Sequence, residues 1–394
     1  MSVRKVKTAV IGSGMISSIY IRNLSRMFSV IDLAAVANIH LEGAEARARE
    51  FGIPRAMTID ELAGDPEIEL AVNLTPAYAH YDVIRRMLLA GKHVYTEKMF
   101  TTDLDKSREL VALAAEKSLY LGVAPDTVLG AGIQTARYLI DTGMIGDVTS
   151  VQVSVNRNQS LNSEIFRFLR GPGGALPYDV GVYYIGALVA LLGSVTRITA
   201  FGNPAPVHQP QMAYLNEGAD PWQIPGINTV AASLRFECGA VGSILFDGNT
   251  AGAVQHGFTV YGTRGILKVG DPDKFGEPVT LIMPENEPVQ MPFTHGFDGK
   301  NRLSEPTSFD HSGHRGIGVA EMAWALRKGR PHARLSGEYG LHCQEVLQGM
   351  DIAAETGKVY ETESRFEMKG LKPGYYSGIY NGAMRGDAEA SLMD

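Results

Sequence analysis

A glycine-rich hexapeptide near the start of the chain has the residue types and spacing that hold a phosphate group. Gly12-Ser13-Gly14-Met15-Ile16-Ser17 lies between an apolar run and an amphipathic segment, as a turn from strand to helix would. In this context Gly12 permits a tight turn, and Gly14 lets the backbone approach a pyrophosphate at the helix N-terminus. We therefore expect Gly12, Gly14, Met15 and Ile16 to bind a dinucleotide. A purely structural turn is the alternative.

The residue that would meet the adenosine ribose is Asn38. An acidic residue that binds the ribose hydroxyls is usual about 20 residues further along the chain, at the end of the second strand. Asn38 can hydrogen-bond a ribose hydroxyl and, being neutral, does not repel a 2′-phosphate. No arginine follows it directly to bind that phosphate, which favours NAD slightly and leaves NADP open. Asn38 could instead cap a helix that begins near Leu41.

The elements that position these residues alternate between strand and helix patterns through residues 1–125. Two Thr-x-x-acid patterns, Thr58 with Glu61 and Thr102 with Asp105, predict capped helix starts. This order predicts a Rossmann domain, a doubly wound parallel sheet with helices on both faces. Its expected strands are Thr8–Ile11, Leu33–Ala37, Leu70–Leu74, His93–Thr96 and Tyr120–Ala124.

The pattern changes at Asp126, where we place the start of a second domain over residues 126–365. Several paired apolar runs predict a large, mainly antiparallel sheet, so this domain is of the α+β class. A Pro/Gly-rich loop is expected at Phe201–Pro225, and residues 366–394 are expected to form a tail. The expected strands and hairpins are Val148–Val155, Ala231–Phe236 with Val241–Phe246, and Tyr261–Lys268; the expected helices are Asp126–Ile140, one from Asp179, Gly316–Leu326 and Gly337–Thr356.

Length and composition exclude several classes of protein. A chain of 394 residues exceeds one ordinary core, which agrees with two domains. The net charge of −7 includes no basic stripe, so nucleic acid is not an expected partner. No run approaches the roughly 18 apolar residues of a membrane span, and the first motif leaves no room for a signal peptide. With two distant cysteines, Cys238 and Cys343, a reducing cytoplasmic location is expected.

No metal site is expected. His311 and His314 have the spacing of a ligand pair, but no third ligand accompanies them. A place in a loop or at the rim of a substrate site is the preferred interpretation.

Four motifs together resemble the Gfo/Idh/MocA family, named for glucose-fructose oxidoreductase and inositol dehydrogenase, and the resemblance covers roughly residues 5–365. Two sequence departures matter. The family's Glu-Lys-Pro is Glu97-Lys98-Met99 here, and its common Asp-x-Gly-x-His ends in tyrosine, as in the glucose-fructose oxidoreductase and dihydrodiol dehydrogenase branches. The motifs are Gly12–Ser17, Asn73-Leu74-Thr75-Pro76 with His80, Glu97-Lys98-Met99, and Gly173–Tyr184 with Asp179-Val180-Gly181-Val182-Tyr183.

The resemblance implies catalytic roles for Lys98, Asp179 and Tyr183. Tyr183 would carry the proton, and since an unperturbed tyrosine has a pKa of about 10, it needs a nearby cation to act as a base. Lys98 could be that cation, and Asp179, four residues before Tyr183 and on the same helix face, could orient it. Each residue alone would have a structural explanation, and Tyr184 is the rival proton carrier.

Further contacts are implied around this trio. On the cofactor side they include the backbone of Asn73, Leu74, Thr75 and Pro76, together with Glu97 and Lys98. His80 is either a cofactor-side contact or a residue that starts a helix. Asp126, Arg157 and Tyr178 are candidates for binding sugar hydroxyls, although solvated surface positions would explain each one singly.

The leading interpretation is an NAD(P)-dependent oxidoreductase that moves a hydride between nicotinamide and a secondary alcohol or ketone of a sugar, glycoside or cyclitol. One alternative is a glycosidase that uses bound NAD for transient oxidation. Another is a catalytically silent dinucleotide-binding sensor or partner protein. The broad sheet would leave one face to cover, so a homodimer or homotetramer is expected.

Overall fold

Six parallel strands form the sheet of the N-terminal half, in the order β3-β2-β1-β4-β5-β6. The computed structural model describes residues 4–251, 254–300, 313–332 and 334–374. The strands are β1 (Val6–Ile11), β2 (Ile31–Asn38), β3 (Arg55–Thr58), β4 (Leu70–Asn73), β5 (His93–Thr96) and β6 (Leu121–Val123). The connecting elements are α1 (Ser17–Arg26), α2 (Leu41–Phe51), α3 (Ile59–Gly64), η1 (Ala77–Ala79), α4 (His80–Leu89) and α5 (Leu104–Glu116). This strand order defines a Rossmann fold and confirms the predicted domain type.

Two local expectations in this domain need correction. The strand β3 was missed because its four residues form no apolar run, and all are only partly buried at the sheet edge. The capping box at Thr58 and Glu61 is present. The capping box expected at Thr102 and Asp105 is absent. Instead, Asp103 caps α5 by accepting a hydrogen bond from Lys106 N at 3.1 Å.

A nine-stranded sheet dominates the second half, in the order β14-β13-β12-β11-β7-β10-β9-β8-β15. Its neighbours are antiparallel except for β7 and β10, which run parallel, so the expected α+β class is confirmed. The strands are β7 (Val148–Asn156), β8 (Val195–Pro204), β9 (Ile227–Phe236), β10 (Val241–Asp247), β11 (Gln255–Gly262), β12 (Ile266–Lys268), β13 (Thr280–Ile282), β14 (Val289–Gln290) and β15 (Tyr360–Glu361).

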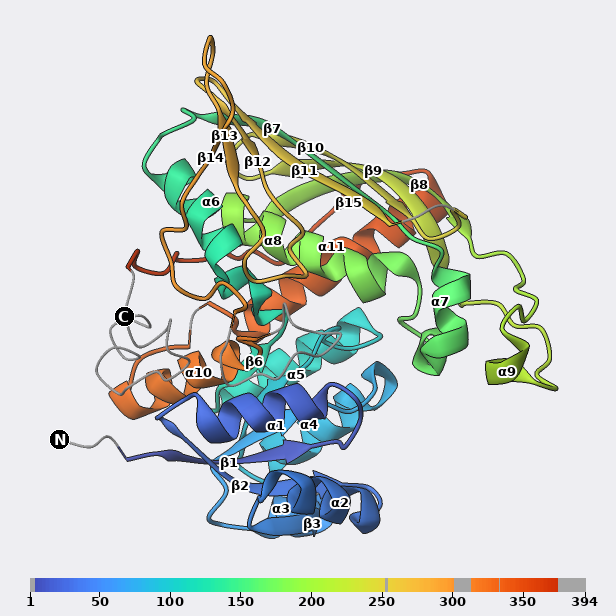
Figure 1. Ribbon diagram of the computed structural model, residues 1–394, viewed down its shortest axis with the longest axis vertical. Coiled ribbons are helices and arrows are strands. Elements are labelled where there is room, and N and C mark those ends of the chain that lie inside the picture. The colour runs from blue at the N-terminus through green and yellow to red at the C-terminus, as the bar shows by residue number, and fades with distance from the viewer. Residues whose placement is uncertain (1–3, 252–253, 301–312, 333, 375–394) are drawn as a thin grey trace.

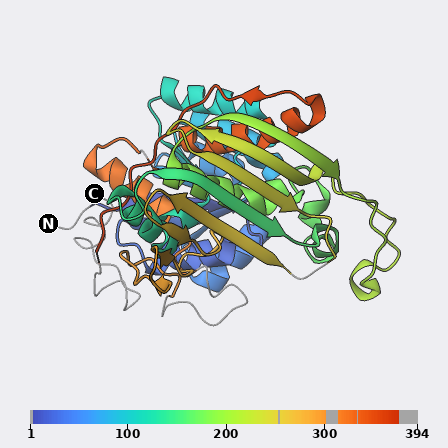
Figure 2. The same cartoon turned by 90° about the horizontal axis from the view of Figure 1, so that it is seen from above.

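Helices fill the space between the two sheets (Figure 1). All eleven residues of α8 are buried, and α11 packs against β8, α8 and the first domain's α5. The helices and short turns of this half are η2 (Asp126–Leu129), α6 (Ala131–Asp141), α7 (Gln159–Ile165), η3 (Arg167–Arg170), the π-type turn η4 (Pro177–Gly181), α8 (Val182–Leu192), α9 (Ala213–Asn216), α10 (Ile317–Lys328) and α11 (Gly337–Thr356). The helices that the structure describes leave the other face of the large sheet uncovered (Figure 2).

Two boundaries in this half differ from expectation. The helix expected over residues 126–140 is divided into η2 and α6, because Gly130 is extended where its backbone lies against Phe275. The expected loop is shorter, since β8 continues to Pro204 in register with β9. The rest of that loop, with α9, projects from the body of the molecule (Figure 2).

Candidate active site

The candidate site lies where the order of the parallel sheet reverses. β1 and β4 are neighbours there, and ligands of such sheets bind in the crevice beyond the carboxyl ends of the strands. Gly12, Asn73 and Glu97 follow or end β1, β4 and β5 at this edge. The second domain reaches the same edge through η4, so the candidate cofactor and substrate residues meet between the domains.

The glycine turn has a shape that suits a pyrophosphate. Gly12 has φ +108°, and a Cβ there would lie 2.8 Å from the carbonyl oxygen of Leu74. A Cβ on Gly14 would meet no atom within 4 Å, so its backbone faces open space. Helix α1 then begins at Ser17 with no side-chain hydrogen bond from its cap residue, Ile16. Ser17 N and Ser18 N donate within the turn, to Gly14 O at 3.1 Å and Met15 O at 3.4 Å, so the turn offers an anion the positive end of the helix and the open backbone of Gly14, which fits the phosphates of a dinucleotide.

The loop after β4 is held by its own side chains. Asn73 accepts hydrogen bonds from Thr75 N at 3.2 Å and Thr75 Oγ1 at 2.7 Å, and donates to Thr96 Oγ1 at 3.0 Å. Leu74 N donates to Ile11 O at 2.8 Å. These contacts fix the backbone from Asn73 to Pro76 beside the glycine turn, in the place where it would border a dinucleotide.

His80 is a buried histidine at the start of α4. Its ring nitrogens lie 2.7 Å from Met99 O and 2.8 Å from Thr75 O, and burial lowers its pKa. Both ring nitrogens are thus occupied by backbone oxygens. His80 begins α4 and ties the loop after β4 to the segment after Lys98, and a cofactor-side contact of His80 stays a prediction.

Glu97 and Met99 hold the backbone on either side of Lys98. Glu97 accepts hydrogen bonds from Tyr20 Oη at 2.8 Å and Lys98 N at 2.9 Å, which connects this segment to α1. The peptide bond between Lys98 and Met99 is cis, and the buried Met99 side chain lies against Gly173 of the second domain. Methionine at the usual proline position therefore makes a contact between the domains.

Lys98 brings the three candidate catalytic residues together. Its Nζ donates to Asp179 O at 2.6 Å and to Asp179 Oδ1 at 2.9 Å. The same atom lies 5.2 Å from the centroid of the Tyr183 ring. Asp179 lies in η4 and Tyr183 in the first turn of α8, so both side chains face the lysine as their spacing indicated.

Asp179 is an ionised carboxylate held from several sides. Gln159 Nε2 donates to its Oδ2 at 3.1 Å, and Arg157 Nη1 lies 3.9 Å from the same oxygen. Burial raises the pKa of Asp179, but the charge and hydrogen bond of Lys98, with Arg157 and Gln159, outweigh it and leave the pKa below its ordinary value. The carboxylate thus stays charged near neutral pH and holds the lysine ammonium in place.

Tyr183 is a neutral phenol in this environment. Its side chain is buried, and the guanidinium carbon of Arg315 lies 5.8 Å from its ring centroid. Burial and the charge of Asp273 raise the pKa of Tyr183 well above its ordinary value, against the opposing charge of Arg315. The arrangement favours a tyrosine that donates a proton over one that is already ionised.

The rival residue Tyr184 faces elsewhere. Its hydroxyl donates to Asp271 Oδ1 at 3.2 Å, and its ring packs near Phe246 and Phe258 of the large sheet. Tyr183, not Tyr184, therefore lies over the lysine.

Only one of the three residues expected to bind sugar hydroxyls lies with this trio, namely Arg157. Asp126 is fully buried, where it accepts hydrogen bonds from Arg315 Nη1 at 3.2 Å and Gly316 N at 2.7 Å. Burial raises its pKa to about 6, against the charge of Arg315. The Tyr178 hydroxyl donates to Asp351 Oδ2 at 2.5 Å, so it is bound to α11.

Several residues near the trio were not expected. Gln159 holds Asp179, and Arg315 lies between Asp126 and Asp273, whose Oδ1 is 3.8 Å from Arg315 Nη2. Asp271 and Asp273 follow β12 closely, and two acidic residues directly after a strand are a weak indication in the sequence that this loop contributes to the site. For Arg315 no signal existed, because its hydrogen-bond partner Asp126 lies 189 residues away in the chain.

The histidine pair gives no metal site in the described residues. His311 lies outside them, and His314 is buried, with its Nδ1 accepting from Gly299 N at 2.9 Å. In the part of the chain that the structure describes, no group of three or more His, Cys, Asp or Glu side chains could hold a metal ion. The helices of that same part include none that is long and apolar enough to cross a membrane.

The fold and the glycine turn define a dinucleotide-binding oxidoreductase with a separate C-terminal domain. Residues 6–124 match the profile described as "Oxidoreductase family, NAD-binding Rossmann fold", and residues 133–268 match the "GFO/IDH/MocA C-terminal domain". The chain belongs to the Gfo/Idh/MocA family of oxidoreductases. The Rossmann domain is therefore the site of a nicotinamide dinucleotide.

Three known relatives share between 17% and 32% of their residues with this chain over the aligned parts. An uncharacterized oxidoreductase from Schizosaccharomyces pombe is 32% identical over 50% of this chain and 54% of its own length. A rabbit (Oryctolagus cuniculus) trans-1,2-dihydrobenzene-1,2-diol dehydrogenase is 27% identical over 67% of this chain and 75% of its own. Among solved structures, a levoglucosan dehydrogenase bound to NADH and levoglucosan has a TM-score of 0.75 at 17% identity, covering 91% of this chain and 99% of that one. The last likeness shows a shared fold.

Proposed function

We propose that the protein is an NAD(P)-dependent dehydrogenase or reductase that acts on a secondary alcohol or ketone of a sugar, glycoside or cyclitol. The observation that carries this proposal is the position of Lys98, whose ammonium bridges Asp179 and the face of Tyr183. This group lies at the edge of the parallel sheet that holds the glycine turn. A proton carrier and a hydride site are therefore neighbours.

The chain's own residues would handle the proton. A bound nicotinamide supplies or accepts the hydride. When a ketone is reduced, the Tyr183 hydroxyl donates its proton to the oxygen that becomes the alcohol. Lys98, held by Asp179, stabilises the negative charge that passes between that oxygen and the phenolate. Oxidation of the alcohol uses the same groups in reverse.

The polar groups around the trio suit a ring with several hydroxyls. Arg157 supplies a donor beside Asp179, and Asp273 supplies an acceptor on the side of Arg315. The names of several relatives agree with such a substrate: a Bacillus subtilis protein is a scyllo-inositol 2-dehydrogenase (NADP(+)), and the solved relative above was bound to levoglucosan. Neighbouring donors and acceptors would orient one hydroxyl-bearing carbon toward the nicotinamide.

A substrate screen tests this function. Sugars, glycosides and cyclitols are offered with NAD and with NADP, and the absorbance of the reduced nicotinamide is followed. We expect at least one compound to give reduced cofactor in equal amount to oxidised product. Cleavage of a glycoside without net reduced cofactor would instead indicate the glycosidase, and no turnover with any compound would indicate a silent dinucleotide-binding protein.

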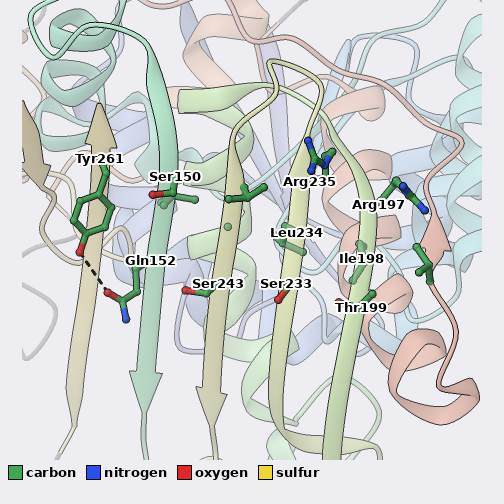
Figure 3. Close-up of a pocket in the computed structure, with 14 residues that line it drawn as sticks. Ser150, Gln152, Arg197, Ile198, Thr199, Ser233, Leu234, Arg235, Ser243 and Tyr261 are labelled. Carbon is green, nitrogen blue, oxygen red and sulfur yellow. Dashed lines mark hydrogen bonds between the residues drawn. The ribbon is translucent and has the colours of Figure 1, made fainter. Parts of the chain in front are cut away.

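We infer that two copies of the chain cover the open face of the large sheet. A shallow hollow crosses β11, β7, β10, β9 and β8 on this face, and serine side chains line its middle (Figure 3). Val241 and Leu245 are 44% and 46% exposed on β10 at the centre of the sheet. Small and apolar side chains line this face together with Arg197, Arg235 and Tyr261, and such an open face suits packing against another sheet.

Light scattering measures the assembly. The native protein is expected to have at least twice the mass of one chain, and Ser243→Arg on the central strand β10 is expected to shift it toward the monomer. Ala112→Arg, on the exposed surface of α5, serves as the matched control and is expected to leave the mass unchanged. A monomer at every concentration would refute the assembly.

A further inference from the structure

A small polar cluster lies where the glycine turn meets the end of β2, formed by Ser13, Asn38 and Arg47. Asn38 Nδ2 donates to Ser13 Oγ at 2.8 Å, and Arg47 Nε donates to Ser13 O at 3.2 Å. A Cβ on Gly43 would lie 2.8 Å from Ser13 Oγ and 2.5 Å from Asn38 Nδ2, so the start of α2 packs tightly on this cluster. In a Rossmann domain the adenosine ribose of the dinucleotide lies at this place.

The cluster has no strong acceptor for a ribose hydroxyl. NAD is recognised here by a carboxylate that accepts hydrogen bonds from the ribose. Asn38 replaces that carboxylate, and its Oδ1 already accepts from Ile39 N at 2.9 Å. Within the described residues, the side-chain partners of Ser13 and Asn38 include no carboxylate. An unmodified ribose would therefore lose the contact that favours NAD.

Arg47 brings a positive charge to the same place. It lies nine residues beyond Asn38, and the second turn of α2 carries it back to the glycine turn. Its side chain is 23% exposed, and its other contact is an ion pair of Nη1 with the exposed Glu50 at 2.6 Å. A guanidinium has five N–H donors in a planar fork that matches a phosphate, so donors remain beyond these two contacts.

We propose that the protein prefers NADP, with Arg47 binding the 2′-phosphate and Asn38 admitting it. The inference rests on the proposed function for its dinucleotide and adds the identity of that dinucleotide. It reverses the slight preference for NAD that the sequence indicated, because no arginine directly follows Asn38 and Arg47 reaches the glycine turn only through the fold. Helix α2 places Arg47 beside Ser13, although the two residues are 34 positions apart in the sequence.

Direct binding separates the two nucleotides without any turnover. Calorimetric titration of the full chain with 2′,5′-ADP and with 5′-ADP, at one salt concentration, isolates the 2′-phosphate. We expect 2′,5′-ADP to bind at least about 10-fold more tightly, and Arg47→Gln to weaken 2′,5′-ADP about 10- to 100-fold, since a charge-assisted contact is lost. Binding of 5′-ADP should change by less than about threefold, which also shows that the variant is folded.

Two further variants sharpen the test. Arg49→Gln removes the same charge from an exposed position of α2 and is expected to leave both affinities unchanged. Asn38→Asp places a carboxylate at the ribose and is expected to reverse the preference in favour of 5′-ADP. Equal affinity of the native chain for the two nucleotides would overturn the inference, as would an equal loss of both in Arg47→Gln.

Failure of this inference differs from failure of the proposed function. Turnover of a sugar with NAD, together with no preference for 2′,5′-ADP, would contradict the inference and leave the function standing. A preference for 2′,5′-ADP without turnover of any sugar, glycoside or cyclitol would support the inference and contradict the proposed function.

Discussion

Lys98→Met is expected to lower kcat/KM about 10²- to 10⁴-fold, the range for loss of a residue that assists proton transfer. The substitution keeps the length of the side chain but removes the ammonium that joins Asp179 to the face of Tyr183. Without it, the Tyr183 phenol loses the cation beside its ring that would stabilise developing negative charge. Steady-state kinetics on the substrate found by the screen measures the loss.

Nucleotide binding at the far end of the cofactor provides the internal control for this variant. Because we propose that the ADP half binds at the glycine turn and α2, Lys98→Met is expected to keep its affinity for 5′-ADP within about threefold. Lys117→Met, at the exposed end of α5, should retain full activity. If Lys98→Met turned over substrate at a rate near that of the native enzyme, Lys98 would have no catalytic role.

Tyr183→Phe is expected to lower kcat by a similar factor, about 10²- to 10⁴-fold, with little change in KM. The ring keeps its packing against Lys98 and Arg315, and only the hydroxyl is lost. The neighbouring Tyr184→Phe removes a hydroxyl bonded to Asp271 and should cost about 1 kcal/mol of stability with little loss of kcat. A large loss of kcat in Tyr184→Phe alone would transfer the proton role to that residue.

The pKa of Tyr183 sets a direction for the pH dependence of these rates. Because burial and Asp273 raise this pKa well above its ordinary value, the phenol is protonated throughout the neutral range. Reduction of a ketone needs the protonated form, so its rate should not fall from loss of this proton up to at least pH 9. Oxidation needs the phenolate and should rise as the pH increases. Initial rates in both directions between pH 6 and 9 measure this, and Tyr183→Phe should lose the rise.

The sequence predicted the parts of the fold that arise from local patterns. Buried parallel strands are nearly continuous apolar runs, so β1, β2, β4 and β5 were located closely, and the period of α11 gave both of its ends. The edge strand β3 has no such run. The first domain and the class of the second therefore followed from the sequence alone.

Candidate site residues could be predicted from the sequence where they belong to a recognisable motif. Lys98, Asp179 and Tyr183 lie together as the resemblance implied, because the motifs include the turns that aim them. Asp126 and Tyr178 have buried partners, Arg315 and Asp351, that are distant in sequence. Ser13 and Arg47 meet through the packing of α2 on the glycine turn. Such pairings depend on tertiary structure, and one chain without its fold does not reveal them.

The contact between Lys98 and Asp179 has a consequence for the independence of the two domains. The amine belongs to the Rossmann domain and the carboxylate to the sheet domain, so neither half alone contains a complete proton-transfer group. A hinge motion that parted the domains would separate the Lys98 ammonium from Asp179 and Tyr183, which would stay together on the second domain. If the trio acts as proposed, proton transfer requires the two domains to be in contact at this point.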